Sequence, residues 1–306
     1  MTRLLGVELR RILARRIVSF VGGIVLLGML IGGVILFARS HRLSPSAAAS
    51  LDQQASAQME QAYQDCLTGL SPDQVPPGNT QEEFCRTITR EGFQPQDPRF
   101  HLAHYRDVAM GLAGLFIVLF GILGASFAGG EWHTGSVATQ LTWEPRRLPL
   151  LGAKLLMTGA FAFVAFLLAE ALLFGVVAPA GILRGTTAGV TATWWRGVTG
   201  ILLRGAVVAS LAAASAHALA SIARNTAAAV GAAFVYGAVL EPLLRQLRPG
   251  WQPWLFFDNV VTFVGGHPTA ITLHPRSMTG AGILVSAYVL GIVAISLAAF
   301  QRRDVT

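Results

Sequence analysis

Charge is scarce in this chain of 306 residues, because 13% of its residues are charged and 53% are hydrophobic. Soluble domains carry charge on about a quarter of their residues, so this composition excludes an ordinary soluble domain. The apolar residues gather in long uncharged runs, which indicate a polytopic membrane protein. The formal net charge of +7 therefore does not argue for nucleic-acid binding, and we expect no nucleic-acid partner.

Lysine is almost absent, since Lys154 is the only one. A phosphate-binding P-loop needs Gly-Lys-Ser/Thr, and Lys154 lies between Ala153 and Leu155. The chain also lacks the His-Glu-x-x-His and Gly-x-Ser-x-Gly signatures of hydrolases. We therefore expect that this chain is not an enzyme and has no catalytic residue or cofactor. If transport is driven by ATP, a separate chain must hydrolyse it.

Cysteine is limited to Cys66 and Cys85, both in the polar segment 39–107. If this segment faces an oxidising compartment, a disulfide between them is expected, and two free thiols are the alternative. Metal binding by His101, His104 and Asp107 is the weaker interpretation of those residues, because two His three residues apart beside a span are poor evidence. We expect no metal site.

The same segment contains two helix starts. Ser44 precedes Pro45, a favoured pairing at a helix N-terminus, and Gly69 and Pro72 end that helix. Thr80-Gln-Glu-Glu83 is a capping box that opens a second helix, which stops near Gly92. Segment 39–107 is thus expected to be a small helical cap outside the membrane, between spans 1 and 2.

The apolar runs predict an all-α polytopic membrane protein with six transmembrane helices, five of them in residues 108–306. Residues 1–16 precede the first span as an amphipathic in-plane helix, with Leu5, Leu9 and Ile12 on one stripe. Residues 245–278 form a loop rich in Trp and Phe that is expected to lie at or dip into the interface. The expected spans are 17–38, 108–130, 155–178, 197–223, 226–244 and 279–300.

A polar hinge, residues 129–147, lies between the second and third spans. Its segment Thr134–Leu141 is long enough for two helical turns, with Thr134 as the N-cap and Pro145 preventing much extension. Arg146 and Arg147 precede the next apolar run, where they suit the headgroup region.

The hinge carries Glu-x-x-x-Gly-Ser from Glu131 to Ser136, followed by Leu-Thr-x-x-Pro-x-Arg from Leu141 to Arg147. This wording resembles the first cytoplasmic loop of type 2 ABC transporter permeases, closest to the short six-span permeases of high-GC Gram-positive bacteria. The resemblance implies a coupling helix at 131–147 that docks on a separate ATPase. An ordinary in-plane loop with an interfacial Trp pair is the alternative.

The resemblance implies a permease that exports a hydrophobic or amphipathic substrate such as a drug, an antibiotic or a lipid, as in multidrug efflux. Its partners would be two ABC ATPase subunits carrying ATP and Mg, a second permease chain and membrane lipids. The tight turn between spans 4 and 5 is a possible second contact. The expected ATPase contacts are Glu131, Trp132, His133, Thr134, Gly135, Ser136, Arg146, Arg147, Arg224 and Asn225.

The two sides of the expected topology carry equal numbers of basic residues, but one side packs them into shorter segments. Five arginines precede the first span on that side. The positive-inside rule counts short loops and span ends, so both termini and the hinge are expected in the cytoplasm, in the plasma membrane.

Four ionisable residues fall within the expected spans, where each is a candidate functional group because burying charge there is costly. Glu170 is the most internal and the best candidate for a substrate path. Arg204 and Glu241 lie toward span ends and favour an interfacial role, and His217 favours polar packing. A proton-driven secondary transporter using Glu170 and Glu241 is the alternative function.

Overall fold

The computed structural model describes residues 2–71, 75, 80–92, 99–267 and 276–302. This part of the chain is helical and contains no strand, apart from an isolated parallel bridge between His101 and Thr186. Within the described residues, six helices are long and apolar enough to cross a membrane. These six helices are Arg16–Arg39, Leu102–His133, Arg147–Arg184, Ala192–Ala223, Thr226–Leu247 and Met278–Arg302. The prediction of an all-helical protein with six such helices is therefore confirmed.

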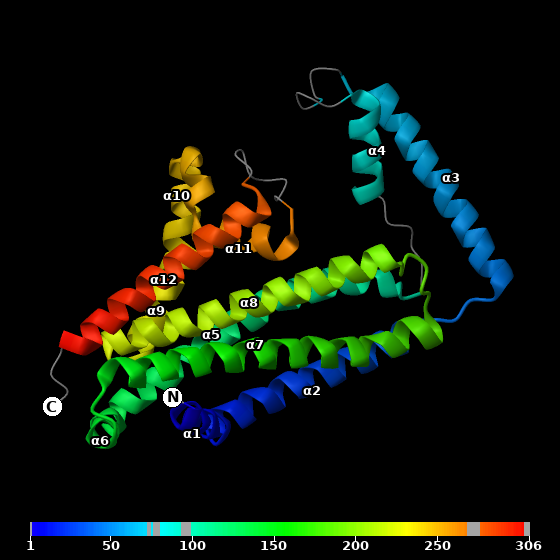
Figure 1. The fold of residues 1–306 in the computed structure, drawn as a ribbon. Helices are drawn as coiled ribbons and strands as arrows, with labels where there is room; N and C mark the ends of the chain where they lie inside the picture. Colours follow the sequence, from blue (N-terminus) through cyan, green and yellow to red (C-terminus); the bar gives the residue numbers. More distant parts are fainter. Residues whose placement is uncertain (1, 72–74, 76–79, 93–98, 268–275, 303–306) are drawn as a thin grey trace. The chain divides into compact units, whose positions relative to one another are not determined.

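Figure 1 labels the helices in chain order. Several are longer than the uncharged runs suggest, because polar residues at their ends continue the backbone hydrogen bonding. The elements are α1 (Thr2–Leu13), α2 (Arg16–Arg39), α3 (Pro45–Gly69), α4 (Gln81–Gly92), η2 (Leu102–His104), α5 (Tyr105–His133), α6 (Ser136–Trp143), α7 (Arg147–Pro179), η3 (Ala180–Arg184), α8 (Ala192–Ala223), α9 (Thr226–Val235), η4 (Tyr236–Leu240), α10 (Glu241–Leu247), η5 (Pro249–Trp254), α11 (Phe256–Gly265) and α12 (Met278–Arg302).

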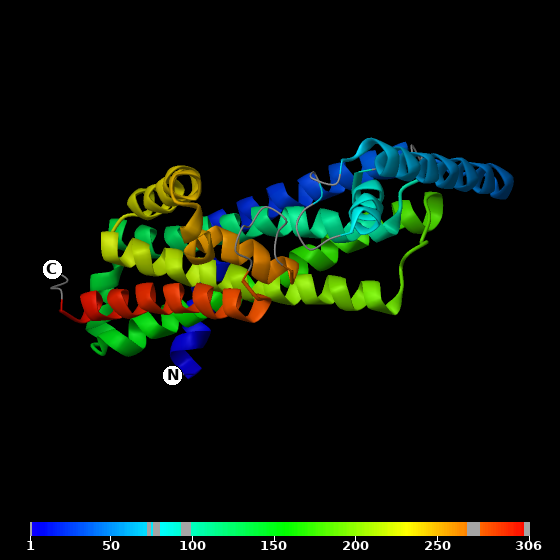
Figure 2. The same cartoon turned by 90° about the horizontal axis from the view of Figure 1, so that it is seen from above.

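The chain packs as two compact units. The larger unit comprises residues 1–31, 103–176 and 189–306. Within it α5 packs along α8, and α12 packs against α8 and α11, an arrangement that can be followed in Figure 2. Small residues permit the closest approach: a Cβ at Gly124 of α5 would lie 2.2 Å from the carbonyl oxygen of Ala213 in α8. Such small-residue contacts bring helix backbones together where no hydrophobic effect drives association in lipid.

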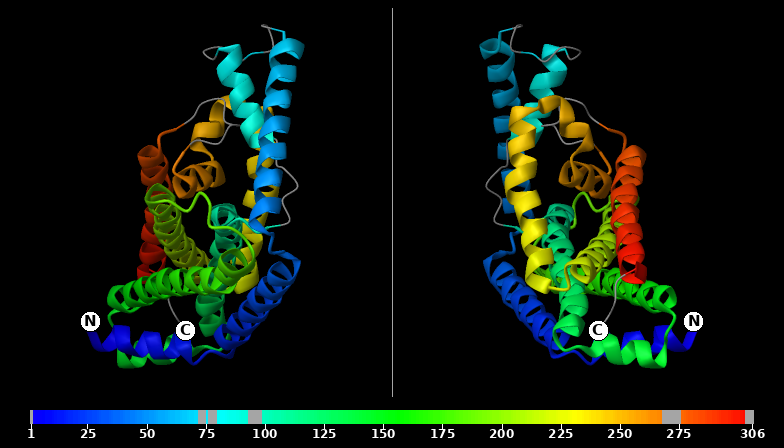
Figure 3. Two further views of the ribbon diagram at one scale, coloured as in Figure 1. Left: turned by 90° about the vertical axis from the view of Figure 1, so that its right-hand side faces the viewer. Right: turned by 90° about the vertical axis from the view of Figure 1, so that its left-hand side faces the viewer.

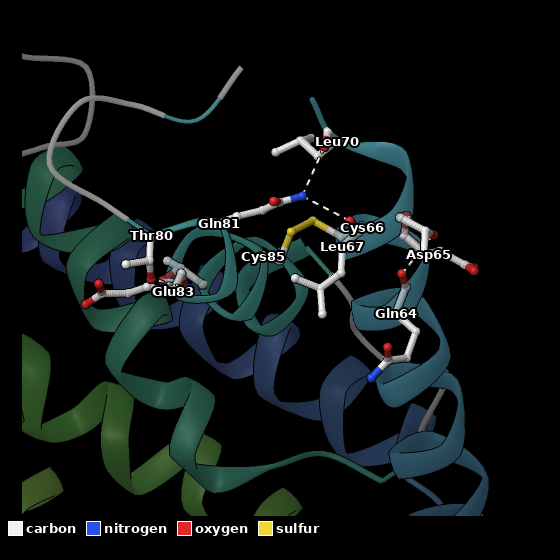
Figure 4. Close-up of a disulfide and its surroundings, with 11 residues drawn as sticks. Gln64, Asp65, Cys66, Leu67, Leu70, Thr80, Gln81, Glu83 and Cys85 are labelled. Carbon is white, nitrogen blue, oxygen red and sulfur yellow. Dashed lines mark hydrogen bonds between the residues drawn. A yellow bond between two sulfur atoms is a disulfide. The ribbon is translucent and has the colours of Figure 1, made fainter. Parts of the chain in front are cut away.

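The smaller unit comprises residues 32–102 and 177–188. Both predicted helix starts are confirmed, because the Ser44 hydroxyl accepts from the Ala47 N–H and the Thr80 hydroxyl from the Glu83 N–H. The predicted disulfide is also present, and Figure 4 shows Cys66 bonded to Cys85 between α3 and α4.

Other polar contacts hold the smaller unit together around α3 and α4. The Gln81 amide donates to the carbonyls of Leu67 and Leu70, at 2.9 and 3.0 Å, which ties the two helices beside the disulfide. The buried Ser40 hydroxyl donates to the carbonyl of Ala180 and accepts from the Phe100 N–H. The cap is thus a hairpin of one long and one short helix.

The segment between α9 and α12 is more helical than the predicted loop over 245–278. It contains the end of α10, the turn η5 and the apolar helix α11, while residues 268–275 lie outside the described part. The loop prediction missed α11 because this helix is short and is stabilised at its ends by residues of other helices, Glu241 of α10 and Arg204 of α8.

Candidate functional site

The hinge forms a sharp turn between two long helices. The first ends at His133 and the second begins at Arg147, with the short helix α6 between them. The predicted two-turn helix exists, but Thr134 is not its N-cap. Thr134 closes α5, donating its hydroxyl to the Gly130 carbonyl at 3.0 Å, and Gly135 takes the N-cap position with φ of 67°. That left-handed backbone is available to glycine at little cost, which explains the turn.

Helix α6 has an inner and an outer face. Val137 and Gln140 point inward and are buried, whereas Ala138, Thr139 and Thr142 are exposed. Trp143 ends the outer face and is 87% exposed, the largest exposed fraction among the large hydrophobic side chains of the described residues. An exposed indole beside threonines suits a protein–protein interface, because Trp is enriched among the residues that contribute most binding energy at such interfaces.

The inner face anchors α6 to three long helices at once. Val137 packs in a buried cluster with Leu151 of α7, Ala218 of α8 and Phe300 of α12. Trp132 packs against the same cluster, with its ring centroid 6.2 Å from that of Phe300. A displacement of α6 is therefore transmitted to α7, α8 and α12 by direct packing.

A buried ionic cluster joins the hinge to the N-terminal helix. The Lys154 ammonium lies 2.7 Å from Glu131 Oε2 and donates to both carboxylate oxygens of Glu8, at 3.1 and 3.2 Å. Each of these three side chains is at most 10% exposed. We call Glu8, Arg15, Glu131 and Lys154 the hinge ion cluster. It connects α1, α5 and α7, and Figure 3 shows α1 and α6 at the same end of the larger unit.

Arg15 completes the hinge ion cluster from the link between α1 and α2. Its guanidinium donates to Glu131 Oε1 at 3.0 Å and to the carbonyl of Phe127 at 3.0 Å. It also lies over the Phe127 ring, 5.0 Å from the centroid. Glu131 thus accepts from two cations, so its buried charge is compensated.

The tight turn between α8 and α9 contacts the hinge from another side. Arg224 has a left-handed backbone with φ of 53°, and its guanidinium lies 4.7 Å from the centre of the Trp132 ring. The Asn225 side chain caps α9 by accepting the N–H groups of Ala227 and Ala228. The turn therefore lies against the hinge, and its contact with an ATPase stays a prediction.

Burial divides the ten expected ATPase contacts into two groups. Glu131 is buried and Trp132 is partly buried, so both are engaged within the chain. Arg147 is half-buried and donates to the Gln301 carbonyl of α12. The members with exposed or partly exposed side chains at the surface are His133, Thr134, Gly135, Ser136, Arg146, Arg224 and Asn225.

Sequence reasoning missed three residues of the hinge ion cluster and the exposed Trp143. Glu8 and Arg15 read as ordinary charges of an amphipathic helix. Lys154 helped to exclude a P-loop and marked the start of the Leu-rich span that contributes to the family resemblance, but no anionic partner was predicted for it. Its rarity was the available signal, because a single lysine among arginines, placed inside an apolar run, must find an anion.

Glu170 lies in the C-terminal third of α7 and is fully buried. The Tyr105 hydroxyl of α5 donates to its main-chain carbonyl at 3.0 Å and lies 3.4 Å from Oε2. Its Oε1 has no hydrogen-bond partner in the described structure. Elsewhere in the bundle His217 Nδ1 lies 3.1 Å from the Thr158 hydroxyl, in keeping with polar packing.

Glu241 and Arg204 occupy the two ends of α11. The Glu241 carboxylate accepts the N–H groups of Phe257 and Asp258 at 2.9–3.2 Å, and it is 1% exposed. The Arg204 guanidinium donates to the Val264 carbonyl at 3.1 Å. An anion at the N-terminus and a cation at the C-terminus both complement the helix dipole, so these side chains stabilise α11.

Comparison with protein-family models, with curated proteins and with solved structures finds no match to this chain.

Proposed function

We propose that this chain is the membrane permease subunit of an ATP-driven ABC transporter, coupled to a separate ATPase through α6. The observation that carries the proposal is the two-sided character of α6. Its inner face packs on α7, α8 and α12, while its outer face, ending in Trp143, is exposed. A motor that presses on this face moves helices instead of bending a loop.

The resemblance of the hinge motif to type 2 ABC permeases supports the same proposal. The working unit is two permeases with two ATPases, since half a transporter cannot enclose a path. ATP and Mg bind the ATPase. The smaller unit with its disulfide lies outside the cell, whereas the termini and the hinge are cytoplasmic. The substrate is a hydrophobic or amphipathic molecule that leaves the cell.

Co-purification tests the coupling. The tagged full chain is purified from membranes of its own cells, and the amount of any co-purifying P-loop ATPase is measured by mass spectrometry. Trp143→Glu places a charge on the outer face, so we expect recovery and permease-stimulated ATP hydrolysis to fall. Trp195→Glu alters a tryptophan that is 44% exposed outside the hinge and serves as the control. Equal recovery with both variants would refute docking on α6.

A proton-driven secondary transporter is the second candidate, and Glu170 is the observation that favours it. A buried carboxyl with one unpartnered oxygen is a possible proton carrier. The test is uptake into proteoliposomes that hold this chain alone under a proton gradient. Gradient-driven transport that disappears in Glu170→Gln would support this candidate and contradict the ABC proposal.

A further inference from the structure

A cavity of about 490 Å³ lies between the fifth and sixth long helices of the larger unit. Four elements contribute to its wall, namely η4, α10, η5 and α12, together with the residue that precedes α11. This volume falls within the range of sites that enclose small molecules. Trp251 and Trp254 are 57% and 59% exposed, so the cavity can be reached from outside the bundle. The lining residues are Tyr236, Leu244, Trp251, Trp254, Leu255 and Tyr288.

The polar groups of the two lining tyrosines are already occupied. The Tyr236 hydroxyl accepts from the Phe256 N–H at 3.3 Å, and the Tyr288 hydroxyl donates to the Trp254 carbonyl at 2.9 Å. The described residues of the wall include no carboxylate or amide side chain. A sugar needs several such groups, whereas an apolar chain needs only ring faces and leucines. The lining therefore favours an apolar ligand.

The charges around the cavity favour an anion. Glu241 caps α11, and one oxygen of Asp258 pairs with Arg245 while its other oxygen, Oδ2, is buried without a partner in the described structure. Arg276 borders the cavity behind the wall residue Trp254, with its guanidinium carbon 5.0 Å from the ring centroid. Its Nε is buried and has no hydrogen-bond partner among the described residues. A buried guanidinium nitrogen without an acceptor can gain a charge-assisted bond from a ligand carboxylate or phosphate.

We propose that this cavity binds an anionic amphiphile, with the acyl chain against Trp251, Trp254 and Leu244 and the anionic head at Arg276. The shared chemistry is an acyl chain with a carboxylate or phosphate head, supplied by a free fatty acid or by a membrane phospholipid. The inference stands apart from the proposed function, because the site involves neither α6 nor a motor.

Binding of radiolabelled palmitate to the purified full chain in phosphatidylcholine nanodiscs tests the proposal. Leu244→Trp fills part of the cavity with an indole and is expected to weaken binding about tenfold, because the ligand loses the space that it would occupy. Arg276→Gln removes the head-group partner and weakens palmitate binding by about tenfold as well. Arg248→Gln alters an exposed arginine just before η5 and leaves binding unchanged. Leu244→Phe is a second, smaller filling if Leu244→Trp does not fold.

Two further probes separate the parts of the proposal. Radiolabelled hexadecanol, a neutral analogue, binds more weakly than palmitate and does not respond to Arg276→Gln. Displacement of palmitate in phosphatidylglycerol nanodiscs identifies a phospholipid as the source, and persistence identifies a free fatty acid; both support an anionic amphiphile. Palmitate binding that survives both fillings, or hexadecanol binding equal to that of palmitate, overturns the proposal.

Discussion

Replacing Lys154 by methionine tests the hinge ion cluster directly. Methionine has a similar length but no charge, so the variant leaves the carboxylates of Glu8 and Glu131 facing each other in a buried site. Arg11 and Arg15 still contact one oxygen of each acid, at 3.1 and 3.0 Å. Breaking a buried ion pair by removing one partner costs about 3–5 kcal/mol, and the remaining arginines place this case near the lower end.

The assay is thermal unfolding of the purified chain in detergent. A loss of about 3 kcal/mol lowers the Tm of a chain of this size by about 5 °C. Arg10→Met is the matched control, because it removes an exposed basic residue from the same N-terminal helix. We expect this control to change the Tm little, since isolated surface charges contribute about 0–1 kcal/mol.

The double variant Lys154→Met with Glu8→Gln checks the cause. Glu8→Gln removes one of the two carboxylate charges that face each other without Lys154, so the double variant is expected to recover part of the lost stability. Neighbouring residues of one ionic network show coupling of about 0.5–3 kcal/mol in such cycles. A Tm for Lys154→Met equal to that of Arg10→Met, or strictly additive effects in the double variant, would refute the reasoning.

The structure also predicts the effects of substitutions at three other sites. Cys85→Ser opens a bridge that spans 19 residues, which costs about 3 kcal/mol, so limited proteolysis of the full chain is expected to cleave between α3 and α4 sooner; an unchanged cleavage rate would contradict this. Gly135→Ala forces an L-residue into a left-handed backbone and costs about 1–2 kcal/mol in thermal unfolding, while Gly135→Asn costs less; equal losses would argue against the backbone explanation. Glu241→Gln weakens the α11 cap, and hydrogen exchange at the Phe257 and Asp258 amides is expected to quicken, with unaltered exchange counting against the cap.

Features set by local sequence could be predicted. Uncharged runs gave the six long helices, and Ser44, Thr80 and the two cysteines gave the helix starts and the disulfide of the smaller unit. Features that depend on contacts between residues distant in the sequence could not be predicted. Lys154 and Glu8 are 146 residues apart, and no pattern within either helix indicates the other. The hinge lies between these cases: its short helix was predictable, whereas its inner and outer faces depend on what packs beneath it.

The missed helix α11 shows the same limit from the side of energetics. Ten residues are too few for a helix to be stable alone, since nucleation is costly and isolated helices need about 12–15 residues. Glu241 and Arg204 supply the missing stabilisation at its two ends, from α10 and α8. Sequence reasoning treated both as interfacial because it judged each by its position along a span.

The two acids proposed as proton carriers are not equivalent, and the difference bears on the choice between functions. Glu241 accepts two backbone N–H groups and holds the N-terminus of α11, so its carboxyl group is already used by the fold. Glu170 has one oxygen 3.4 Å from the Tyr105 hydroxyl and one oxygen without a partner in the described structure, so its carboxyl group is less committed to the fold. A proton-driven mechanism that uses both Glu170 and Glu241 is therefore disfavoured at Glu241, whereas an ATPase that acts on α6 needs neither residue. That asymmetry, together with the exposed outer face of α6, favours the ATP-driven proposal.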